Sequence, residues 1–350
     1  MASIPSLSPP EFWQATRDQG AIDVRSPAEF RQGHISAAIS LPLFDDQQRS
    51  EIGTLYKHQG RQAAVLRGLE MIGRNQSQLV KQVIDLANRN AVYIHCWRGG
   101  MRSASLAQIV QLTGVNPHLL EGGYKAFRGW ARRFFEFPWK LVVVSGLTGV
   151  GKTNLLHALE RVGEQVLDLE GLANHRGSAF GAIGLPPQPT TEQFENLLFE
   201  RLVRFDPERV VWLEDEASRV GKVVIPDPLY VQLRHAPAYF VQCSRQRRIE
   251  TLVADYGKAT ASDLEEALTK IGKRMDGQKL KTAMAAIHQR DFHTVADLAL
   301  EYYDKRYQVA VTKIPRKTMI HVDAESMSDH ERAIHLIQLA QDLFLRHEIV

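Results

Sequence analysis

Two short segments of this chain combine residue types that carry chemistry, and the first is rich in glycine. It reads Gly146-Leu147-Thr148-Gly149-Val150-Gly151-Lys152-Thr153. The segment matches all eight positions of a P-loop, follows a β-branched run at 141–145 and precedes a pattern typical of an amphipathic helix. In such a loop backbone N–H groups cradle phosphate oxygens and the lysine neutralises the terminal groups. The sequence therefore predicts a diphosphate or polyphosphate site at Gly146, Gly149, Gly151, Lys152 and Thr153.

A divalent cation is expected beside this loop. The Thr153 hydroxyl can ligate Mg²⁺. The apolar run 210–213 ends in Glu214-Asp215-Glu216, and carboxylates at the end of a nearby strand often serve the same ion. Glu214 and Asp215 are thus candidate metal partners; the alternative is a solvated strand end without a ligand. The sequence indicates no tightly bound organic cofactor, and no guanine- or adenine-reading motif accompanies the loop.

The second segment surrounds a cysteine and reads His95-Cys96-Trp97-Arg98-Gly99-Gly100-Met101-Arg102-Ser103. Cys96 lies between a strand-like run and a helix pattern, so N–H groups at the helix start can converge on its sulfur. The two arginines favour the nucleophilic thiolate, and the two glycines let the backbone curl around an anion. We expect Cys96, Arg98, Arg102 and Lys152 to be the catalytic residues. Cys243, by contrast, is typical of a small buried side chain.

The elements that position these loops alternate between strand and helix. Strands are expected at 21–24, 91–95, 141–145 and 210–213, and helices over 66–86 and 103–112. Capping boxes at Thr190, Ser262 and Ser328 open three further helices. This alternation predicts an α/β protein with parallel sheets and a largely helical C-terminal third. Phe137-Pro138 marks a boundary between domains at 1–136 and 137–350.

Positive charge gathers in the C-terminal part. Residues 234–290 hold 11 Lys and Arg against 6 Asp and Glu. A solvated helical surface and a polyanionic partner both fit this charge. The candidate substrate or RNA contacts are Arg245, Arg247, Arg248, Lys273 and Arg274, together with His175, Arg176 and Gly68. Gly68 interrupts a helix pattern, which indicates either a close approach to a ligand or a tolerated glycine. Tyr302, Tyr303 and Tyr307 fit either base stacking or a core.

Composition limits the remaining possibilities. The chain has 350 residues, 44% hydrophobic and 24% charged, with a formal net charge of +3, as in ordinary globular proteins. No apolar run approaches a membrane span, and the first ten residues show no secretion signal. Two cysteines cannot build a disulfide framework, which favours a reducing, cytoplasmic location.

The N-terminal part resembles the rhodanese family. The resemblance rests on Asp23-Val24-Arg25-Ser26-Pro27-Ala28-Glu29-Phe30, on Gly33-His34-Ile35, on Glu121-Gly122-Gly123 and on Trp130. Five residues separate Cys96 from Arg102, where single-domain sulfurtransferases of this family usually have four. A loop of this length also resembles those of rhodanese-fold and tyrosine phosphatases, which hold a tetrahedral phosphate. A phosphatase would also need a general acid, and nothing in the sequence marks Asp45 or Asp46 for that role.

The two segments together resemble one family, the tRNA 2-selenouridine synthases, over nearly the whole chain. Further matching stretches are 168–178, 212–216 and Ile225-Pro226. The resemblance implies a rhodanese-like parallel-sheet domain joined to a P-loop NTPase-like α/β domain with a helical, basic C-terminal part. It implies geranylation of wobble 2-thiouridine from geranyl diphosphate in the Lys, Glu and Gln tRNAs, followed by replacement of the geranylthio group by selenium from selenophosphate. In this scheme the P-loop holds the diphosphate and residues 96–103 hold selenophosphate; whether Cys96 forms a perselenide stays open.

Two other functions fit parts of the sequence. One is a rhodanese-fold phosphatase, or a P-loop kinase or NTPase with an accessory sulfurtransferase domain. The other is a binding scaffold without catalysis. A phosphatase gives the P-loop no role, a kinase gives Cys96 none, and a scaffold has no need for Cys96 or Lys152. Transfer chemistry with two phosphorus-containing substrates uses both loops, so we expect a transferase.

Overall fold

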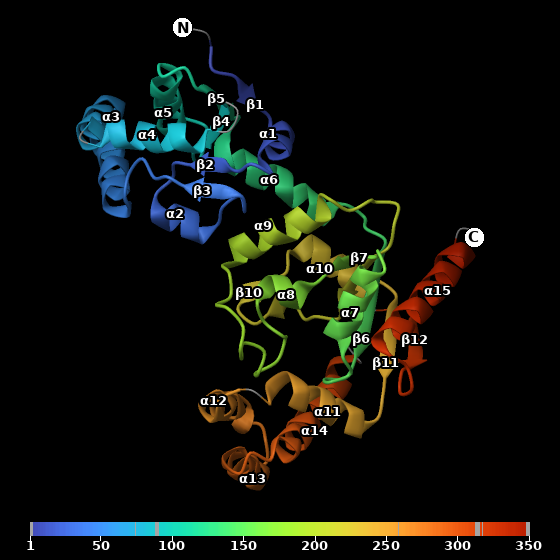
Figure 1. Cartoon of the computed structure of the whole chain (residues 1–350). Helices are drawn as coiled ribbons and strands as arrows, with labels where there is room; N and C mark the ends of the chain where they lie inside the picture. Colours follow the sequence, from blue (N-terminus) through green and yellow to red (C-terminus); the bar gives the residue numbers. More distant parts are fainter. Residues whose placement is uncertain are drawn as a thin grey trace. The chain divides into compact units, whose positions relative to one another are not determined.

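The computed structural model describes residues 3–73, 75–87, 91–257, 259–311, 316 and 318–347. The chain divides into two compact units, Met1–Phe134 and Phe135–Val350, which Figure 1 shows in blue to green and in green to red. The expected domain boundary after Glu136 is close to this division. Each unit is built around its own five-stranded sheet, and the α/β class expected from the sequence is confirmed.

The first unit is a parallel sheet with helices between its strands. The strand order is β1-β5-β4-β2-β3, and every neighbouring pair runs parallel. The strands are β1 (Ser6–Leu7), β2 (Ala21–Asp23), β3 (Ala38–Ser40), β4 (Ala91–His95) and β5 (Asn116–Leu120). The helices are α1 (Pro9–Thr16), α2 (Pro27–Gln32), α3 (Asp46–Gly73), α4 (Gln76–Leu86), α5 (Met101–Gln111) and α6 (Gly123–Glu136), whose last two residues reach into the second unit.

Helix α3 is two helices joined at Gly60. Gly60 has φ 86° and ψ −177°, a conformation that favours glycine. The two halves then pack against each other, because Arg67 in the second half donates to Glu51 in the first at 2.7 Å. Gly68 is buried at this contact, where an added Cβ would lie 3.3 Å from the Phe44 ring and 3.5 Å from the Ile52 side chain. Gly68 therefore serves packing, which favours the alternative of a tolerated glycine over a close approach to a ligand.

The second unit carries the P-loop strand at the centre of its sheet. The order is β12-β11-β6-β8-β7, again with parallel neighbours. The strands are β6 (Leu141–Gly146), β7 (Gln165–Leu167), β8 (Val211–Glu214), β11 (Ala238–Gln242) and β12 (Met319–Asp323), and a separate hairpin pairs β9 (Arg219–Val220) with β10 (Val223–Val224). The chain leaves β6 toward β7 and β8 on one side and returns to β11 on the other, so a crevice is expected at the end of β6.

Helices of the second unit fall into two groups. The sheet is accompanied by α7 (Lys152–Arg161), α8 (Leu169–Ala173), α9 (Thr191–Leu202), α10 (Asp227–His235) and α15 (Asp329–His347). Residues 245–311, which we call the helical segment, contain α11 (Arg245–Tyr256), α12 (Ala261–Gly272), α13 (Gly277–His288) and α14 (Phe292–Val311). The sheet and the helical segment have separate apolar cores, one around Val142, Leu156 and Trp212 and the other around Leu264, Leu268 and Ala283.

Two element boundaries differ from the sequence expectation. The pattern over 66–86 is not one helix, because α3 ends at Gly73 and α4 begins at Gln76. The helix expected to start at Ser262 is capped two residues earlier, where the Thr260 hydroxyl accepts from Asp263 N–H at 3.2 Å. The caps at Thr190 and Ser328 are confirmed. Within the described part of the chain, no helix combines the length and hydropathy that crossing a membrane requires.

Candidate functional site

The P-loop follows β6 directly and is held open by glycine conformations. Gly146, Gly149 and Gly151 have φ of 147°, 83° and 84°, which other residues rarely adopt. Backbone also approaches closely, since a Cβ at Gly146 would lie 2.7 Å from the Val241 carbonyl oxygen. Lys152 is the first residue of α7, and its Nζ donates to the Gly146 carbonyl at 3.2 Å. The lysine thus bends back over the loop, where its charge faces the anion site.

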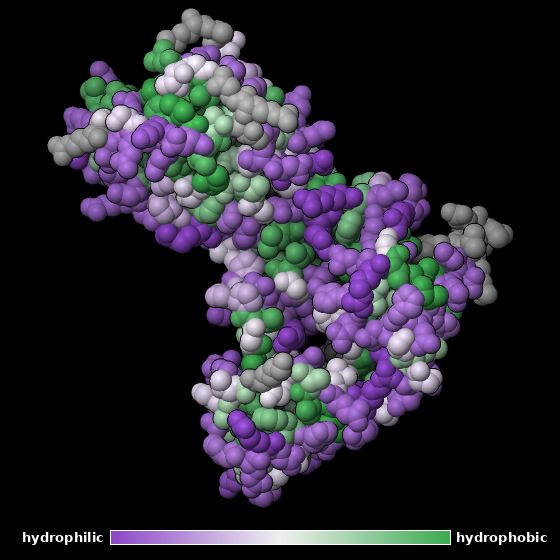
Figure 2. All heavy atoms as spheres, in the orientation of Figure 1, coloured by the Kyte–Doolittle hydropathy of each residue, from purple (hydrophilic) through white to green (hydrophobic). Residues whose placement is uncertain are grey.

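A cavity of about 430 Å³ extends from this loop, within the usual range for small-molecule sites. We call the part lined by P-loop residues, Glu170, Asp215, Glu216 and the segment 176–178 its polar end. We call the part lined by the helical segment, which is mostly apolar but includes Thr251 and Asp255, its apolar end. The apolar lining includes Leu252, Leu264, Phe292, Val295, Ala296 and Ala299. Figure 2 shows hydrophobic residues, in green, among the hydrophilic ones on the surface of the second unit. The cavity therefore suits a molecule with a phosphate head and an apolar tail.

Helix α6 anchors the cysteine loop of the first unit by two backbone hydrogen bonds. Tyr124 N–H donates to the Cys96 carbonyl and Lys125 N–H to the Trp97 carbonyl, both at 2.9 Å. Gly99 and Gly123 both have φ of 63°, and a Cβ at Gly123 would lie 2.5 Å from the Cys96 carbonyl oxygen. The glycines of the Glu121-Gly122-Gly123 segment thus let α6 pack directly against the loop backbone.

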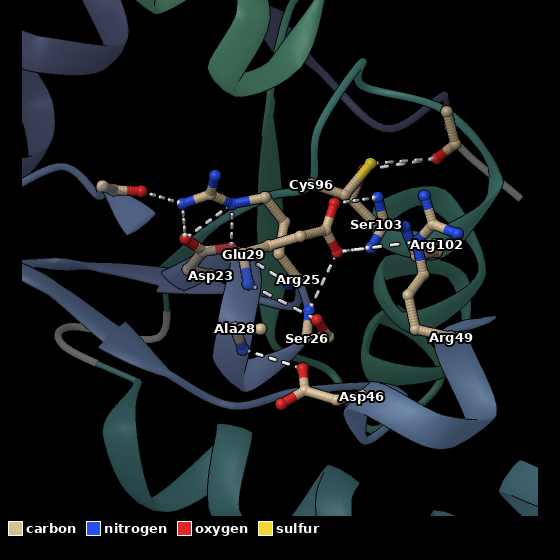
Figure 3. Close-up of polar contacts among 12 residues, drawn as sticks. Asp23, Arg25, Ser26, Ala28, Glu29, Asp46, Arg49, Cys96, Arg102 and Ser103 are labelled. Carbon is tan, nitrogen blue, oxygen red and sulfur yellow. Dashed lines mark hydrogen bonds and ion pairs between the residues drawn. The ribbon is translucent and has the colours of Figure 1, made fainter. Parts of the chain in front are cut away.

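The sulfur of Cys96 lies beside the start of α5. The cysteine is 3% exposed, and the Ser103 hydroxyl donates to its Sγ at 3.2 Å, as Figure 3 shows. A hydroxyl donor and the N-terminus of a helix both stabilise a thiolate. Arg98 and Gly100 are exposed and Trp97 is half-buried, so the loop surface beyond the sulfur faces solvent. Met101 begins α5 and is 46% exposed.

Comparison with known proteins matches both units. The family model described as tRNA 2-selenouridine synthase AAA domain matches residues 139–336, and a rhodanese-like domain model matches residues 8–129. The tRNA 2-selenouridine synthase of Sulfurovum sp. (strain NBC37-1) is 33% identical over 87% of this chain and 92% of that protein. The chain belongs to the tRNA 2-selenouridine synthase family.

Two further relatives carry the same name. The protein from Shewanella denitrificans is 32% identical over 87% of this chain and 92% of its own length. The protein from Nitrosomonas europaea is 38% identical over 68% of this chain and 64% of its own length. The matches to the full-length relatives span both loops, so the cysteine loop and the P-loop belong to one shared architecture.

In this member of the family, carboxylates crowd the polar end of the cavity. Glu170 accepts from the Thr153 hydroxyl at 3.1 Å, and Gly177 packs over Glu170 and Glu216 so closely that a Cβ would lie within 3 Å of both. Burial raises the pKa of Glu170, and burial together with the Glu170 charge raises the pKa of Glu216 well above its usual range, despite the nearby Lys152. Ionising both carboxyl groups together is therefore unfavourable unless a cation joins them.

The two predicted metal partners have other roles. Glu214 is fully buried and accepts from the N–H groups of Leu169 and Glu170 at 3.0 and 3.4 Å. It therefore caps α8, and its expected part in a metal site is wrong. Asp215 lines the cavity, but Arg316 donates to both its oxygens at 2.7 Å and Ser145 donates to it at 2.7 Å. Arg316 and Ser145 lower the Asp215 pKa against the effect of burial.

Oxygen donors for Mg²⁺ are nevertheless present at the cavity. Mg²⁺ prefers oxygen ligands and usually takes one or two protein groups besides substrate phosphates. Thr153, Glu170 and Glu216 offer such oxygens next to Lys152. Among the described residues, no three His, Cys, Asp or Glu side chains converge as a complete metal site. The donor set thus fits an ion that a bound diphosphate helps to hold.

The His175-Arg176 pair is divided by the fold. Arg176 lines the cavity, and its guanidinium carbon lies 5.3 Å from the Tyr256 ring centroid. His175 instead packs against the backbone of Gly181 and Gly221, where an added Cβ would lie within 3 Å of its ring. Burial lowers the His175 pKa. Arg176 therefore remains a candidate substrate contact, whereas His175 has a packing role.

Two arginines of the basic cluster on α11 bind groups of the same chain. Arg248 is 4% exposed; it donates to the Thr148 carbonyl at 2.7 Å and to both oxygens of Asp304. The expectation that Arg248 contacts RNA is therefore wrong, because its guanidinium fixes the P-loop to α14. Arg247 donates to the carbonyls of Ala324, Glu325 and Met327.

Exposed positive charge remains at three of the expected positions of the helical segment. Arg245 is exposed and pairs with Asp297 at 2.6 Å, while Lys273 and Arg274 are exposed. These three remain candidate RNA contacts. Of the tyrosines of α14, Tyr302 is 8% exposed and belongs to the core, whereas Tyr303 and Tyr307 line the cavity.

A buried charged network supports the cysteine loop. Arg25 is completely buried, pairs with Asp23 at 2.6 Å and lies with its guanidinium carbon 3.8 Å from the Tyr124 ring centroid. Burial opposes ionisation of Asp23, but His95 and Arg25 together hold its pKa below the ordinary value. The motif around Asp23 in the sequence thus supplies the arginine that packs on Tyr124, whose backbone N–H binds the Cys96 carbonyl. Sequence reasoning gave no role to Glu29, Glu170 or Glu216; the capping box Ser26 to Glu29 was the one available signal for Glu29.

Proposed function

We propose that this chain converts 2-thiouridine of tRNA into 2-selenouridine in two steps, geranylation and then selenation. As a family member it is a tRNA-modifying transferase. The observation that carries the two-step proposal is the single cavity that joins the P-loop to an apolar lining. Geranyl diphosphate has one anionic and one apolar end, which matches this lining.

The P-loop unit would carry out the alkylation. The thiocarbonyl sulfur attacks C1 of geranyl diphosphate, the S–C1 bond forms, the C1–O bond breaks, and diphosphate leaves while the base loses its N3 proton. Lys152 and the loop N–H groups face the charge that develops on the leaving group, which is where preorganised donors lower a barrier. Mg²⁺ bound at Thr153 and Glu170 would supply further charge neutralisation. The apolar end excludes water from the allylic carbon.

The cysteine loop would carry out selenation. After alkylation, geranylthiol is a far better leaving group than the original sulfur, so C2 becomes open to attack. Attack of the Cys96 thiolate on phosphorus of selenophosphate forms a P–S bond, breaks the P–Se bond and releases hydrogenselenide. Hydrogenselenide adds at C2 and expels geranylthiol, and water then hydrolyses the phosphocysteine to phosphate.

Electron balance favours attack of Cys96 on phosphorus over direct transfer of selenium to the Cys96 sulfur. Selenium keeps its oxidation state throughout the phosphocysteine route, and phosphorus ends as phosphate. A perselenide on Cys96 would instead require phosphorus to leave as phosphite or an added oxidant. The loop length of five residues between Cys96 and Arg102 is the phosphatase-like spacing and supports a tetrahedral phosphorus group at this sulfur.

The proposed partners follow from the two steps. They are selenophosphate, geranyl diphosphate and tRNAs with wobble 2-thiouridine, those for Lys, Glu and Gln, in the cytoplasm. The exposed cations Arg245, Lys273 and Arg274 would face the tRNA phosphates, where each contact adds salt-dependent affinity. Both cysteines are free thiols, which suits a reducing compartment.

Mass spectrometry of digested tRNA tests the proposal. Purified protein with 2-thiouridine tRNA and geranyl diphosphate should yield the geranylated nucleoside, and added selenophosphate should convert it to 2-selenouridine. Lys152→Ala should lower alkylation by about 100-fold or more and still allow selenation of tRNA that is already geranylated. Cys96→Ala should show the opposite pattern.

Two outcomes would contradict the proposal. Stimulation of ATP hydrolysis by tRNA without any change in nucleoside mass would favour the NTPase alternative. Equal loss of both steps in each variant, with unfolding temperatures unchanged, would reject the division of labour between the loops.

A further inference from the structure

One stripe of α14 lines the cavity from the P-loop to its far end. The lining residues of this helix are Phe292, Val295, Ala296, Ala299, Tyr303 and Tyr307. Their spacing of three and four residues places them on a single helical face. The cavity is therefore bordered along its length by successive turns of one helix.

The orientation of the stripe is fixed at its P-loop end. The Tyr307 hydroxyl lies 2.8 Å from the Ser145 hydroxyl, and Ser145 immediately precedes the P-loop. At the next turn, Ala179 N–H donates to the Tyr303 hydroxyl at 3.0 Å. Beyond these two tyrosines the lining residues are apolar, and Val295, Ala296 and Ala299 are at most 8% exposed. The stripe thus passes from polar to apolar with distance from the phosphate site.

Helices α11 and α12 add further apolar side chains to the lining, beside the polar Thr251 and Asp255 of α11. Leu252 and Val253 of α11 and Leu264 of α12 line the cavity, and Leu264 is 2% exposed within the core of the helical segment. The two alanines are the smallest side chains of the α14 stripe. Space in this part of the cavity therefore depends on the absence of bulk at positions 296 and 299.

The pitch of the helix matches the repeat of an isoprenoid chain. One helical turn rises about 5.4 Å. One isoprene unit adds four carbons to the main chain, which is about 5 Å for bonds of about 1.5 Å. Two units beginning near Tyr307 span about 10 Å, and Ala299 lies eight residues from Tyr307, about 12 Å along the axis. A ten-carbon chain would end at the turn of Ala299.

We infer that α14 acts as a ruler for the prenyl donor, with Ala299 and Ala296 setting the longest chain that the cavity accepts. The inference rests on the proposed function, because it assumes that the P-loop holds the diphosphate of this donor. Bulk at Ala299 cuts off the second isoprene unit. Bulk at Ala296, about one turn deeper, leaves room for two units and cuts off the third.

Three diphosphates with one, two and three isoprene units test the ruler: dimethylallyl, geranyl and farnesyl diphosphate. The wild-type chain, Ala299→Phe and Ala296→Phe are compared by transfer to 2-thiouridine tRNA and by competition of each diphosphate against geranyl transfer. Ala299→Phe should weaken geranyl and farnesyl diphosphate at least tenfold relative to dimethylallyl diphosphate. Ala296→Phe should weaken farnesyl diphosphate at least tenfold and leave the geranyl-to-dimethylallyl ratio within about twofold of wild type.

Ala285→Phe is the matched control, since Ala285 is exposed on α13 and is not part of the cavity lining. It should change none of the ratios. The unfolding temperature of each variant, compared with that of the wild-type chain, reports whether the second unit is folded. Ala299→Leu and Ala296→Leu replace any phenylalanine variant that fails this check.

The outcomes separate the ruler from the proposed function. Unchanged ratios in both variants, or an equal loss for all three diphosphates in a variant with the wild-type unfolding temperature, would overturn the ruler. Absence of prenyl transfer by the wild-type chain from every donor would overturn the proposed alkylation itself. A graded cut-off that moves with position 299 or 296 supports both.

Discussion

Glu29 on α2 binds both terminal nitrogens of Arg102 on α5, with oxygen–nitrogen distances of 2.6 and 3.2 Å (Figure 3). Burial would lower the Arg102 pKa, but the Glu29 carboxylate more than offsets this effect and raises it. The same pairing holds the Glu29 pKa below its ordinary value in spite of burial. Arg49 adds a second cation 3.6 Å from Glu29. Glu29 therefore orients the arginine that closes the cysteine loop.

Replacing this carboxylate should affect one reaction only. Glu29→Gln keeps the shape but removes a charge-assisted hydrogen bond worth about 1.5–3 kcal/mol, so we expect selenation to slow roughly 10- to 100-fold. Geranylation should stay within about twofold, because it takes place in the other unit. Rates of each step on tRNA, followed by mass spectrometry, provide the measurement. Glu70→Gln, which alters an exposed pair with Arg67, is the control and should leave both rates unchanged.

The route through phosphorus predicts a trapped intermediate on Cys96. Selenophosphate added without tRNA should leave one phosphoryl group on the protein, located at Cys96 by peptide mass spectrometry after rapid acid quench. Ser103→Ala removes the donor to the Cys96 sulfur and should slow formation of this adduct by about tenfold. Cys243→Ser should be labelled like the wild-type chain. Selenium on Cys96 without phosphorus, accompanied by phosphite release, would reject the phosphorus route.

Two arginines only three residues apart should differ sharply in their importance for stability. Arg248 pairs with Asp304 in a largely buried position and holds Thr148 of the P-loop, so Arg248→Ala should lower the free energy of unfolding by about 3 kcal/mol. Arg245 pairs with Asp297 at the exposed surface, and Arg245→Ala should cost less than about 1 kcal/mol. Urea unfolding of both variants checks this. Similar small losses in both, with tRNA affinity reduced equally, would restore the RNA role for Arg248.

The sequence predicted the strands correctly where a local apolar pattern coincides with burial inside a sheet. β4 and β6 are continuous apolar runs followed by glycine-rich turns, and both lie inside their sheets. The pattern over 66–86 misled because two consecutive helices, α3 ending at Gly73 and α4 beginning at Gln76, present nearly the same periodicity as a single helix. The strand Met319–Asp323 escaped notice because it is a short edge strand with mixed polarity.

The candidate site was predicted less completely than the fold. Cys96, Lys152 and the glycines stand in contiguous motifs, which a sequence displays directly. Partners such as Glu29 for Arg102 or Asp304 for Arg248 lie 73 and 56 residues away, and only the fold brings them together. A basic residue in the sequence looks the same whether it faces a polyanion or, like Arg248, a buried carboxylate. The apolar half of the cavity likewise arises from helices whose residues resemble any helical core.

The crowded carboxylates should make the stability of the second unit depend on pH. Burial and the charge of Glu170 raise the Glu216 pKa well above the ordinary glutamate value, so the folded state binds a proton more tightly than the unfolded state. Stability from this group is therefore present below the ordinary value and falls as pH rises through the raised one. In buffer with EDTA, Glu216→Gln should raise the free energy of unfolding at pH 8, on the order of 1 kcal/mol or more, and raise it less at pH 5.

Mg²⁺ should reverse the order of stability of the wild-type chain and Glu216→Gln at pH 8. An ion held by these oxygens relieves the repulsion, so Mg²⁺ with diphosphate should stabilise the wild-type chain at pH 8 more than Glu216→Gln. Glu250→Gln, at an exposed position on α11, should match wild type at both pH values and with or without the ion. Loss of stability in Glu216→Gln at pH 8 would mean that attraction to Lys152 exceeds the repulsion from Glu170, and the negative charge would then be structural rather than reserved for a cation.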